Sequence, residues 1–398
     1  MKGKRALLVF LFGIALVSAS RLGYLVLYAV AAVYALSLWC VRRAFRGIRV
    51  ERRLSAAKAF MGQEIAVTVT AFNRSRLPLG WLCLRAWNEP NLAVSGSLAR
   101  AGLMPGRGTF TLAYRVAGMH RGYYRLGDIH LSGGDPLGWN PVESVAGGLG
   151  AGVTVYPPIT PLCGVPLPGV RPFGARRDKS RANEDPTRLG GIRDYQPGDN
   201  PRRIHWPASA CRGRLQVKEF VPTVTAESLI LLNLGEAEYP VDSWASLGEL
   251  AVETAASLVV HLANLGTAVG LATHGRDPEN PGHGDLAFHP GAGAGQAEAL
   301  LTLLARVEVA PGAGFAGFVD LHGRGAAFGA NLFIITPSWG AELTRAARGL
   351  KRQGKKPVPL LLEPARGGGQ KAALLAGLSP YEVRRDRRSG EVRIGRGA

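Results

Sequence analysis

The sequence predicts a multidomain protein made of an N-terminal transmembrane helical hairpin, an all-β sandwich and an α/β doubly wound domain. Two uncharged apolar segments lie before residue 42, turn residues then recur at intervals of about ten, and apolar strands alternate with helical segments after residue 226. The predicted boundaries are two membrane helices within 1–47, a β-sandwich over 48–160, a linker and polar box over 161–222, the α/β domain over 223–370 and a basic tail over 371–398.

The two apolar segments predict where the chain sits. Residues 22–41 are long enough to cross a bilayer core of about 30 Å, whereas residues 6–19 are short and end in small residues that also suit a signal-peptidase site. Basic residues flank both outer ends, which the positive-inside rule places in the cytoplasm. We therefore expect a multi-pass protein of the inner (plasma) membrane with the bulk of the chain cytoplasmic, and the body stays cytoplasmic if the first segment is cleaved. These residues are Lys2, Lys4, Arg5, Arg42, Arg43 and Arg46.

Composition excludes several classes of protein. The 398 residues hold 48 Lys plus Arg against 29 Asp plus Glu, a net charge of +19, but the charged fraction is only 19%, so the excess reflects a shortage of acids. None of the four cysteines forms a Cys-x-x-Cys pair, which argues against a zinc ribbon, a thioredoxin-like site and a disulfide framework and favours a reducing compartment. No phosphate-binding loop and no dinucleotide fingerprint is present.

Residues 48–158 alternate with a period of two. Ile65, Val67 and Val69 lie on one face of a predicted strand, and the turn spacing favours an immunoglobulin-like sandwich. The aromatic and basic run 120–125 suits either base stacking on nucleic acid or one strand with a wet face, and we favour the strand, so no nucleic-acid partner is expected. Arg49, Arg52, Arg53 and Lys58 extend the basic stretch and serve either as topology determinants or as contacts to anionic lipid.

A polar box over 186–220 is the densest polar and aromatic stretch of the chain. Residues 195–201, Tyr-Gln-Pro-Gly-Asp-Asn-Pro, combine a proline that fixes φ with a glycine that accepts the left-handed conformation, which predicts a turn. Ile204 and Trp206 follow as expected anchors. The residues that we single out are Arg193, Asp194, Tyr195, Gly198, Asp199, Arg203, His205, Trp206 and Ser209.

The box resembles the signature of the bacterial domain of unknown function 58 (DUF58) family. The matching stretches are 193–195, 197–199, 203–206 and 209–210, and the Gly-Asp-Pro-Leu-Gly turn at 134–138 is similar to that family's Asp-Pro-Phe-Gly turn. The resemblance implies a von Willebrand A-like fold for the α/β domain and a MoxR-type AAA+ ATPase as partner. Pro207 and Cys211 stand where members of the family usually carry Lys and Arg, and Arg212 is a possible substitute for a missing cation.

A metal site is not expected. A continuous apolar run at 227–234 predicts a buried parallel strand, and the metal of von Willebrand A domains binds an Asp-x-Ser-x-Ser motif after the first strand. The equivalent residues here are Asn233, Gly235 and Ala237, which supply neither carboxylate nor hydroxyl. Glu236 and Glu238 occupy the intervening positions and are expected to point elsewhere.

Catalytic residues and cofactors are not predicted either. His283 and His289 lie in a Gly-rich loop with Asp285 between them, which is more typical of a solvated loop than of a metal site. Cys211 and His205 lie six residues apart with no third group to orient them.

Two interpretations of the box remain open, a partner-docking surface and a structural staple in which an Asp–Arg network lies under a Trp. We expect a membrane-anchored cytoplasmic scaffold or adaptor, not an enzyme, that docks a MoxR-type ATPase through the box. The alternatives are a thiol- or His-dependent enzyme using His205, Asp199 and Cys211, or an anionic lipid or nucleic-acid binder driven by net charge.

Overall fold

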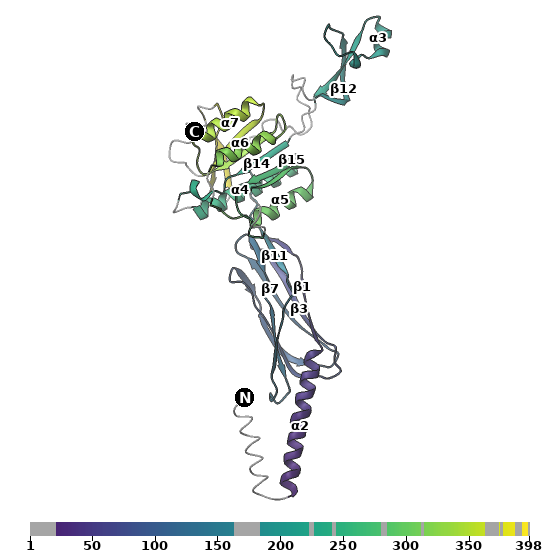
Figure 1. The fold of residues 1–398 in the computed structure, drawn as a ribbon, viewed down its shortest axis with the longest axis vertical. Coiled ribbons are helices and arrows are strands. Elements are labelled where there is room, and N and C mark those ends of the chain that lie inside the picture. The colour runs from purple at the N-terminus through teal and green to yellow at the C-terminus, as the bar shows by residue number, and fades with distance from the viewer. Residues whose placement is uncertain are drawn as a thin grey trace. The chain divides into compact units, whose positions relative to one another are not determined.

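A computed structural model describes residues 21–162, 184–222, 227–240, 244–279, 285–311, 314–362, 374, 377–386 and 392–396. The chain divides into two compact units, Met1–Pro157 and Pro158–Ala398, which are described separately (Figure 1). The predicted helix at 6–19 lies outside the described residues. Helix α2 spans Arg21–Arg46, and its most apolar 18-residue window has a mean hydropathy of 2.0 and is 6% buried, so one N-terminal apolar helix is present.

The first unit is a β-sandwich. Its two four-stranded sheets have the orders β1-β3-β7-β5 and β10-β9-β4-β6, and a small three-stranded sheet has the order β2-β11-β8. The strands are β1 Ile48–Leu54, β2 Lys58–Phe60, β3 Glu64–Asn73, β4 Leu79–Ala86, β5 Leu92–Ser95, β6 Ala99–Met104, β7 Thr109–Gly118, β8 Gly122–Arg125, β9 Ile129–Gly134, β10 Val142–Ala146 and β11 Gly152–Tyr156.

The period of two in the sequence produces the core of this sandwich. Val67 and Val69 of β3 are fully buried and belong to one apolar cluster with Leu82 and Leu84 of β4, which come from the opposite sheet. Alternate side chains of each strand therefore meet between the sheets, as in other sandwiches. In the aromatic run, Tyr124 is buried and donates its hydroxyl to the carbonyl oxygen of His120, which fits a half-buried strand.

Helix α2 is joined rigidly to the sandwich. Only Gly47 separates its last residue from β1, and Val41 and Ala44 are buried in the sandwich core. Asp135, in the turn after β9, accepts a hydrogen bond from Ser37 Oγ at 2.7 Å, from the backbone N–H of Trp139 at 2.7 Å and from Asn140 through its backbone and side-chain nitrogens at 3.1 and 3.0 Å. One buried carboxylate thus ties the helix to the turn between β9 and β10.

The second unit contains a seven-stranded sheet of order β16-β15-β14-β17-β18-β19-β20, in which the five central strands are parallel and the two edge strands antiparallel. Helices α6 and α7 cover one face, where their side chains pack on Leu229 and Leu231, and α4 and α5 lie on the other (Figure 1). The elements are β14 Glu227–Leu232, η2 Glu236–Glu238, α4 Trp244–Asn264, β15 Ala268–Thr273, β16 Leu286–Gly291, α5 Ala294–Arg306, α6 Phe315–Gly325, β17 Asn331–Thr336, α7 Ala341–Arg352, β18 Lys356–Leu362, β19 Tyr381–Arg385 and β20 Val392–Arg396.

In the described residues, two strands lie in the range 371–398 that the sequence predicted as a basic tail. Strands β19 and β20 continue the sheet, and three of their arginines are paired: Arg384 with Glu382, Arg393 with Asp386, and Arg385 with the buried Glu253 of α4. The positive charge that suggested a loose tail is therefore partly neutralised inside the domain. Helix α4 also has the length and apolar character of a membrane span, but 72% of its most apolar 18-residue window is buried, as in a core helix.

We predict that Asp135→Asn lowers the free energy of unfolding by about 1.5–3 kcal/mol, because a charged acceptor of four hydrogen bonds is lost. Burial alone would raise the pKa of Asp135, but the hydrogen bonds from Ser37, Trp139 and Asn140 outweigh it and hold the pKa below its usual 3.8. The ionised form therefore stabilises the fold above about pH 4, and this contribution is lost as the pH falls through the depressed pKa.

Thermal unfolding of the full chain in detergent from pH 7 to pH 3 tests this prediction. The gap between wild type and Asp135→Asn should narrow on acidification, whereas Glu143→Gln, at an exposed carboxylate on the neighbouring β10, should follow the wild type throughout. A gap of constant size down to pH 3 would contradict the ionic clamp.

Candidate functional site

The box forms most of a β-hairpin together with its long connection. Strands β12, Glu184–Asp194, and β13, Gln216–Pro222, pair antiparallel, and between them lie the turn, the short 3-10 helix η1 at Pro201–Arg203 and helix α3 at Trp206–Arg212. We did not predict these strands from the sequence, because we interpreted the whole stretch 161–222 as a linker and the box. The hairpin gives the box its own frame of backbone hydrogen bonds.

The turn is closed by an ion pair. Arg193, at the end of β12, donates two hydrogen bonds of 2.7 Å, one to each carboxylate oxygen of Asp199. Asp199 also accepts the backbone N–H of Gln196 at 2.9 Å, and its own N–H bonds the carbonyl oxygen of Gln196 at 3.0 Å. Gly198 has a φ of +104°, a conformation that disfavours any side chain, which explains the Pro-Gly-Asp sequence. Such bidentate pairing fixes direction as well as distance.

Helix α3 is capped and tied down by polar residues. His205 accepts the N–H of Ala208 through Nδ1 at 3.1 Å, and its carbonyl oxygen accepts the hydroxyl of Ser209 at 3.0 Å. That hydroxyl oxygen accepts in turn the N–H of Gln216 at 2.8 Å. The helix ends at Gly213, whose φ is +66°. His205 and Ser209 therefore have structural roles that their place in the sequence motif did not indicate.

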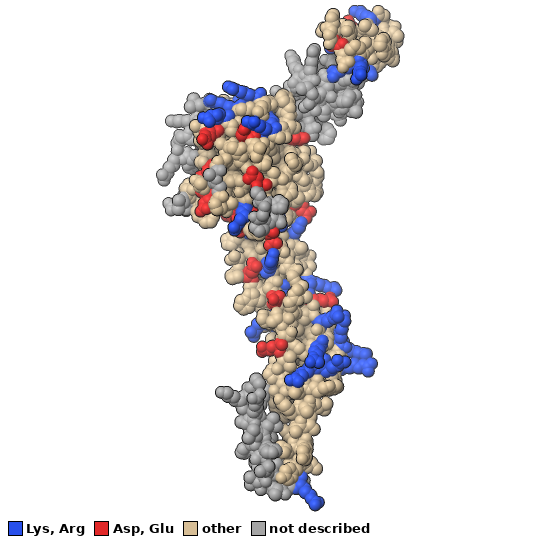
Figure 2. Space-filling view, in the orientation of Figure 1, with Lys and Arg blue, Asp and Glu red and all other residues tan. Residues whose placement is uncertain are grey.

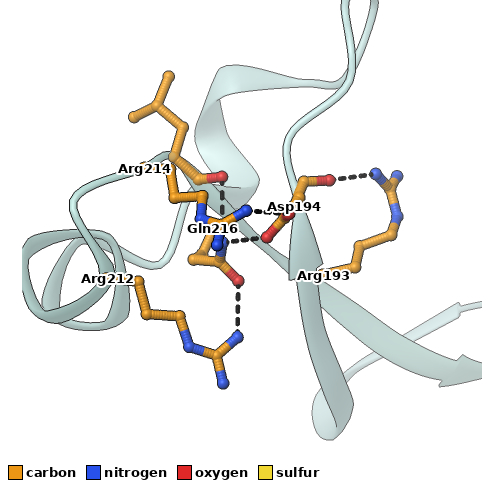
Figure 3. A network of polar contacts seen from close by, with 6 residues as sticks. Arg193, Asp194, Arg212, Arg214 and Gln216 are labelled. Atoms are coloured by element: carbon orange, nitrogen blue, oxygen red, sulfur yellow. Dashed lines mark hydrogen bonds and ion pairs between the residues drawn. The ribbon is translucent and has the colours of Figure 1, made fainter.

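Gln216 lies at the centre of a second network (Figure 3). Its fully buried side chain accepts a hydrogen bond from Arg212 at 3.2 Å and donates a short one to Asp194. Arg214 approaches the same Asp194 carboxylate at 3.4 Å, and Arg193 donates to the Asp194 carbonyl oxygen at 3.1 Å. Sequence reasoning missed Gln216, because a lone glutamine in a strand carries no chemical signal of its own.

The side chain expected to act as an anchor is exposed. Trp206 is 66% exposed, so the described structure does not bury the indole over the network. Its neighbours Pro207, Cys211 and Leu215 are exposed as well, whereas Ile204 bridges to Val217 of β13. Tyr195 is half-buried and its N–H bonds the carbonyl oxygen of Leu215 at 2.9 Å. The box therefore bonds many of its polar groups internally and exposes apolar side chains together with arginines.

The alternative of a thiol and histidine pair gains no support from this geometry. Because Nδ1 of His205 accepts a backbone N–H, the neutral ring carries its proton on Nε2 and has no free lone pair for a base. Of the histidine-rich loop, His283 lies outside the described residues, and Asp285 faces His322 at 3.5 Å. Arg203, the remaining member of the singled-out set, ends η1 and is half-buried.

The strand ends of the α/β domain form a second polar cluster. Asn233 is fully buried and donates through Nδ2 to Glu238 Oε2 at 2.8 Å and to Thr336 Oγ1 at 3.0 Å, while its Oδ1 accepts the N–H of Gly235 at 3.0 Å. Glu238 also accepts the N–H of Phe315 at the start of α6, at 3.2 Å, and the hydroxyl of Ser338 at 3.3 Å. The expectation that Glu238 points elsewhere is therefore wrong.

In this cluster the amide of Asn233 lies between carboxylate and hydroxyl oxygens of the kind that bind a hard cation. An NH₂ group in that place donates two hydrogen bonds to the same oxygens. Gly235 and Ala237 add no side-chain ligand, and no group of three or more His, Cys, Asp or Glu side chains with metal-binding geometry occurs in the described part of the chain. The absence of a metal stays a prediction.

A comparison with protein families finds a match that includes most of the box. Residues 191–313 match the family described as "Protein of unknown function DUF58". This part of the chain belongs to the DUF58 family. The match begins at the box and continues into the α/β domain as far as the loop after α5. The resemblance recognised in the sequence is thereby confirmed.

The uncharacterized protein YeaD of Bacillus subtilis is 24% identical over 238 residues, which cover 58% of this chain and 57% of YeaD. The matched region thus spans little more than half of that relative. Among solved structures, a CARDB domain from Pyrococcus furiosus (15% identity, 27% of this chain, 91% of that chain, TM-score 0.19) and a cohesin from Archaeoglobus fulgidus (17%, 27%, 91%, 0.18) are similar.

We predict that Asn233→Asp creates a cation site, because an added carboxylate would then face Glu238 and two hydroxyls. Magnesium at ten times its Kd should stabilise this variant by about 1.4 kcal/mol. The wild type and Asn264→Asp, which adds the same charge at an exposed helix end, should not respond. Thermal unfolding with and without MgCl₂ measures the effect. Stabilisation of the wild type by magnesium would show that the natural cluster already binds a metal.

Proposed function

We propose that this protein is a membrane-anchored adaptor whose box docks a partner protein, a MoxR-type AAA+ ATPase. In this proposal α2 crosses the inner membrane together with a first helix at 6–19, and the bulk of the chain lies in the cytoplasm, because arginines lie at the C-terminal end of α2. The sandwich is immunoglobulin-like and the α/β domain is a metal-free von Willebrand A-like module.

The exposed indole of Trp206 carries the proposal. Protein interfaces are enriched in Trp, Tyr and Arg, and a few such side chains supply most of the binding energy. Here the indole lies on a capped helix whose polar neighbours are bonded to one another, so a partner would meet a preformed surface. The resemblance to the DUF58 family supplies the partner class.

The charge of the box indicates what kind of partner surface would fit it. Residues 186–220 hold seven basic and three acidic residues, and Arg202, Arg212 and Arg214 are exposed beside the indole's helix. Asp199 is occupied by Arg193. The complementary surface is therefore an apolar pocket with an acidic rim, because like charges across an interface are unfavourable.

A catalytic role is not proposed. Cys211 is exposed, but His205 is engaged as a helix cap, and no described residue orients the two as a nucleophile and base. The proposal accordingly includes no cofactor and no nucleic-acid partner.

We predict that Trp206→Ala reduces recovery of the ATPase at least tenfold when the tagged full chain is purified from crosslinked native membranes. A tenfold loss corresponds to about 1.4 kcal/mol, and the loss of a hot-spot side chain, about 2 kcal/mol or more, would exceed it. Trp87→Ala is the matched control, because Trp87 is 67% exposed on the β-sandwich. Quantitative mass spectrometry of the ATPase measures recovery, and circular dichroism checks that both variants fold. Equal recovery with both variants would rule out the box as the docking surface.

A further inference from the structure

The end of the sandwich next to α2 carries a group of exposed arginines. Arg42, Arg43 and Arg46 lie in the last two turns of the helix, and Arg74, Arg76 and Arg107 lie on two loops of the sandwich. Figure 2 shows the blue of Lys and Arg gathered at the level where the sandwich meets α2. We call these six residues the arginine collar.

Backbone hydrogen bonds hold the two loops against the helix end. The N–H of Arg74 bonds the carbonyl oxygen of Gly47, and the N–H of Arg107 bonds that of Ser75, at 3.0 and 2.8 Å. Gly106 lies so close to the carbonyl of Arg76 that an added Cβ would be 2.1 Å from its oxygen. The collar therefore belongs to one packed region of the first unit.

The collar is free to bind an anion. The segments 42–49, 74–76 and 105–108 contain no Asp or Glu, and within the described residues none of the six guanidinium groups makes an ion pair. Arg52 of the same sandwich behaves differently, because it is partly buried and donates to the carbonyl oxygens of Leu126 and Gly127. Arg107 also adopts a φ of +55°, where glycine would be unstrained, so the turn keeps a side chain at a conformational cost.

We propose that the collar binds the phosphate groups of anionic phospholipids at the membrane surface. The positive-inside rule accounts for arginines within about 20 residues of a membrane helix, and Arg74, Arg76 and Arg107 lie farther along the chain and reach the helix end only through folding. The three loop arginines are thus placed by the sandwich, at the level where α2 leaves its apolar stretch. The inference rests on α2 crossing the membrane, as in the proposed function.

Lipid titration of the detergent-solubilised full chain, followed by native mass spectrometry, tests the collar. Wild type should prefer phosphatidylglycerol over phosphatidylcholine. In the triple variant Arg74→Gln/Arg76→Gln/Arg107→Gln this preference should fall at least tenfold, because each basic residue near an anionic surface strengthens binding about fivefold. The control Arg85→Gln/Arg115→Gln/Arg125→Gln removes the same charge elsewhere on the sandwich and should change the preference less than twofold.

Two further readouts separate the possible failures. Sodium carbonate washing of native membranes reports whether the chain is integral, and extraction of the wild type would contradict the membrane anchor of the proposed function. A chain that stays in the membrane, and whose lipid preference survives the loop substitutions or falls equally in the control, would overturn the collar. A stronger loss of preference at high salt in the wild type than in the loop variant would support it.

Discussion

The bidentate pair between Arg193 and Asp199 is the contact on which the organisation of the box depends. It joins the end of β12 to the turn, and the chain that leaves this turn must then return to β13. Ser209 and Gln216 complete that return through the Ser209 hydroxyl. Several charges and backbone groups of the box are bonded internally, while the side chain of Trp206 is exposed.

A second buried carboxylate plays the same part in the first unit. Asp135 collects hydrogen bonds from Ser37 of α2 and from the following turn, so the helix and the sandwich form one body. The loops that carry Arg74 and Arg107 bond to the chain at the same helix end. Two Asp-containing turns that look alike in the sequence therefore serve different purposes, one holding the apolar helix and the other supporting an exposed surface.

Periodicity predicted most of the regular structure. The alternation in β3 and the continuous apolar run of β14 both depend on burial, and burial is what hydropathy patterns record. Strands β12, β13, β19 and β20 were missed because they are short or charged, and their pairing depends on distant partners such as Glu253 for Arg385. Helix α6 was also missed, since its glycines weaken the helical pattern.

The site was predicted in part. The residue types of the box indicated an Arg–Asp turn, and the structure has one, but the exposure of Trp206 and the direction of Glu238 could not be read from the sequence. Both depend on which neighbouring groups pack against or hydrogen-bond each side chain. The Glu238 carboxylate accepts hydrogen bonds from Asn233, Ser338 and the first N–H of α6, and these partners lie up to 100 positions away in the sequence. Spacing in a motif does not encode such partners.

Site-specific photocrosslinking tests the central claim most directly. A benzophenone amino acid placed at position 206 of the full chain, and at position 87 as the control of equal exposure, would be activated in native membranes and the adducts sequenced by mass spectrometry. The account predicts that position 206 alone joins to peptides of a MoxR-type AAA+ ATPase. Adducts of position 206 with lipid or with other segments of this chain, and none with the ATPase, would contradict it.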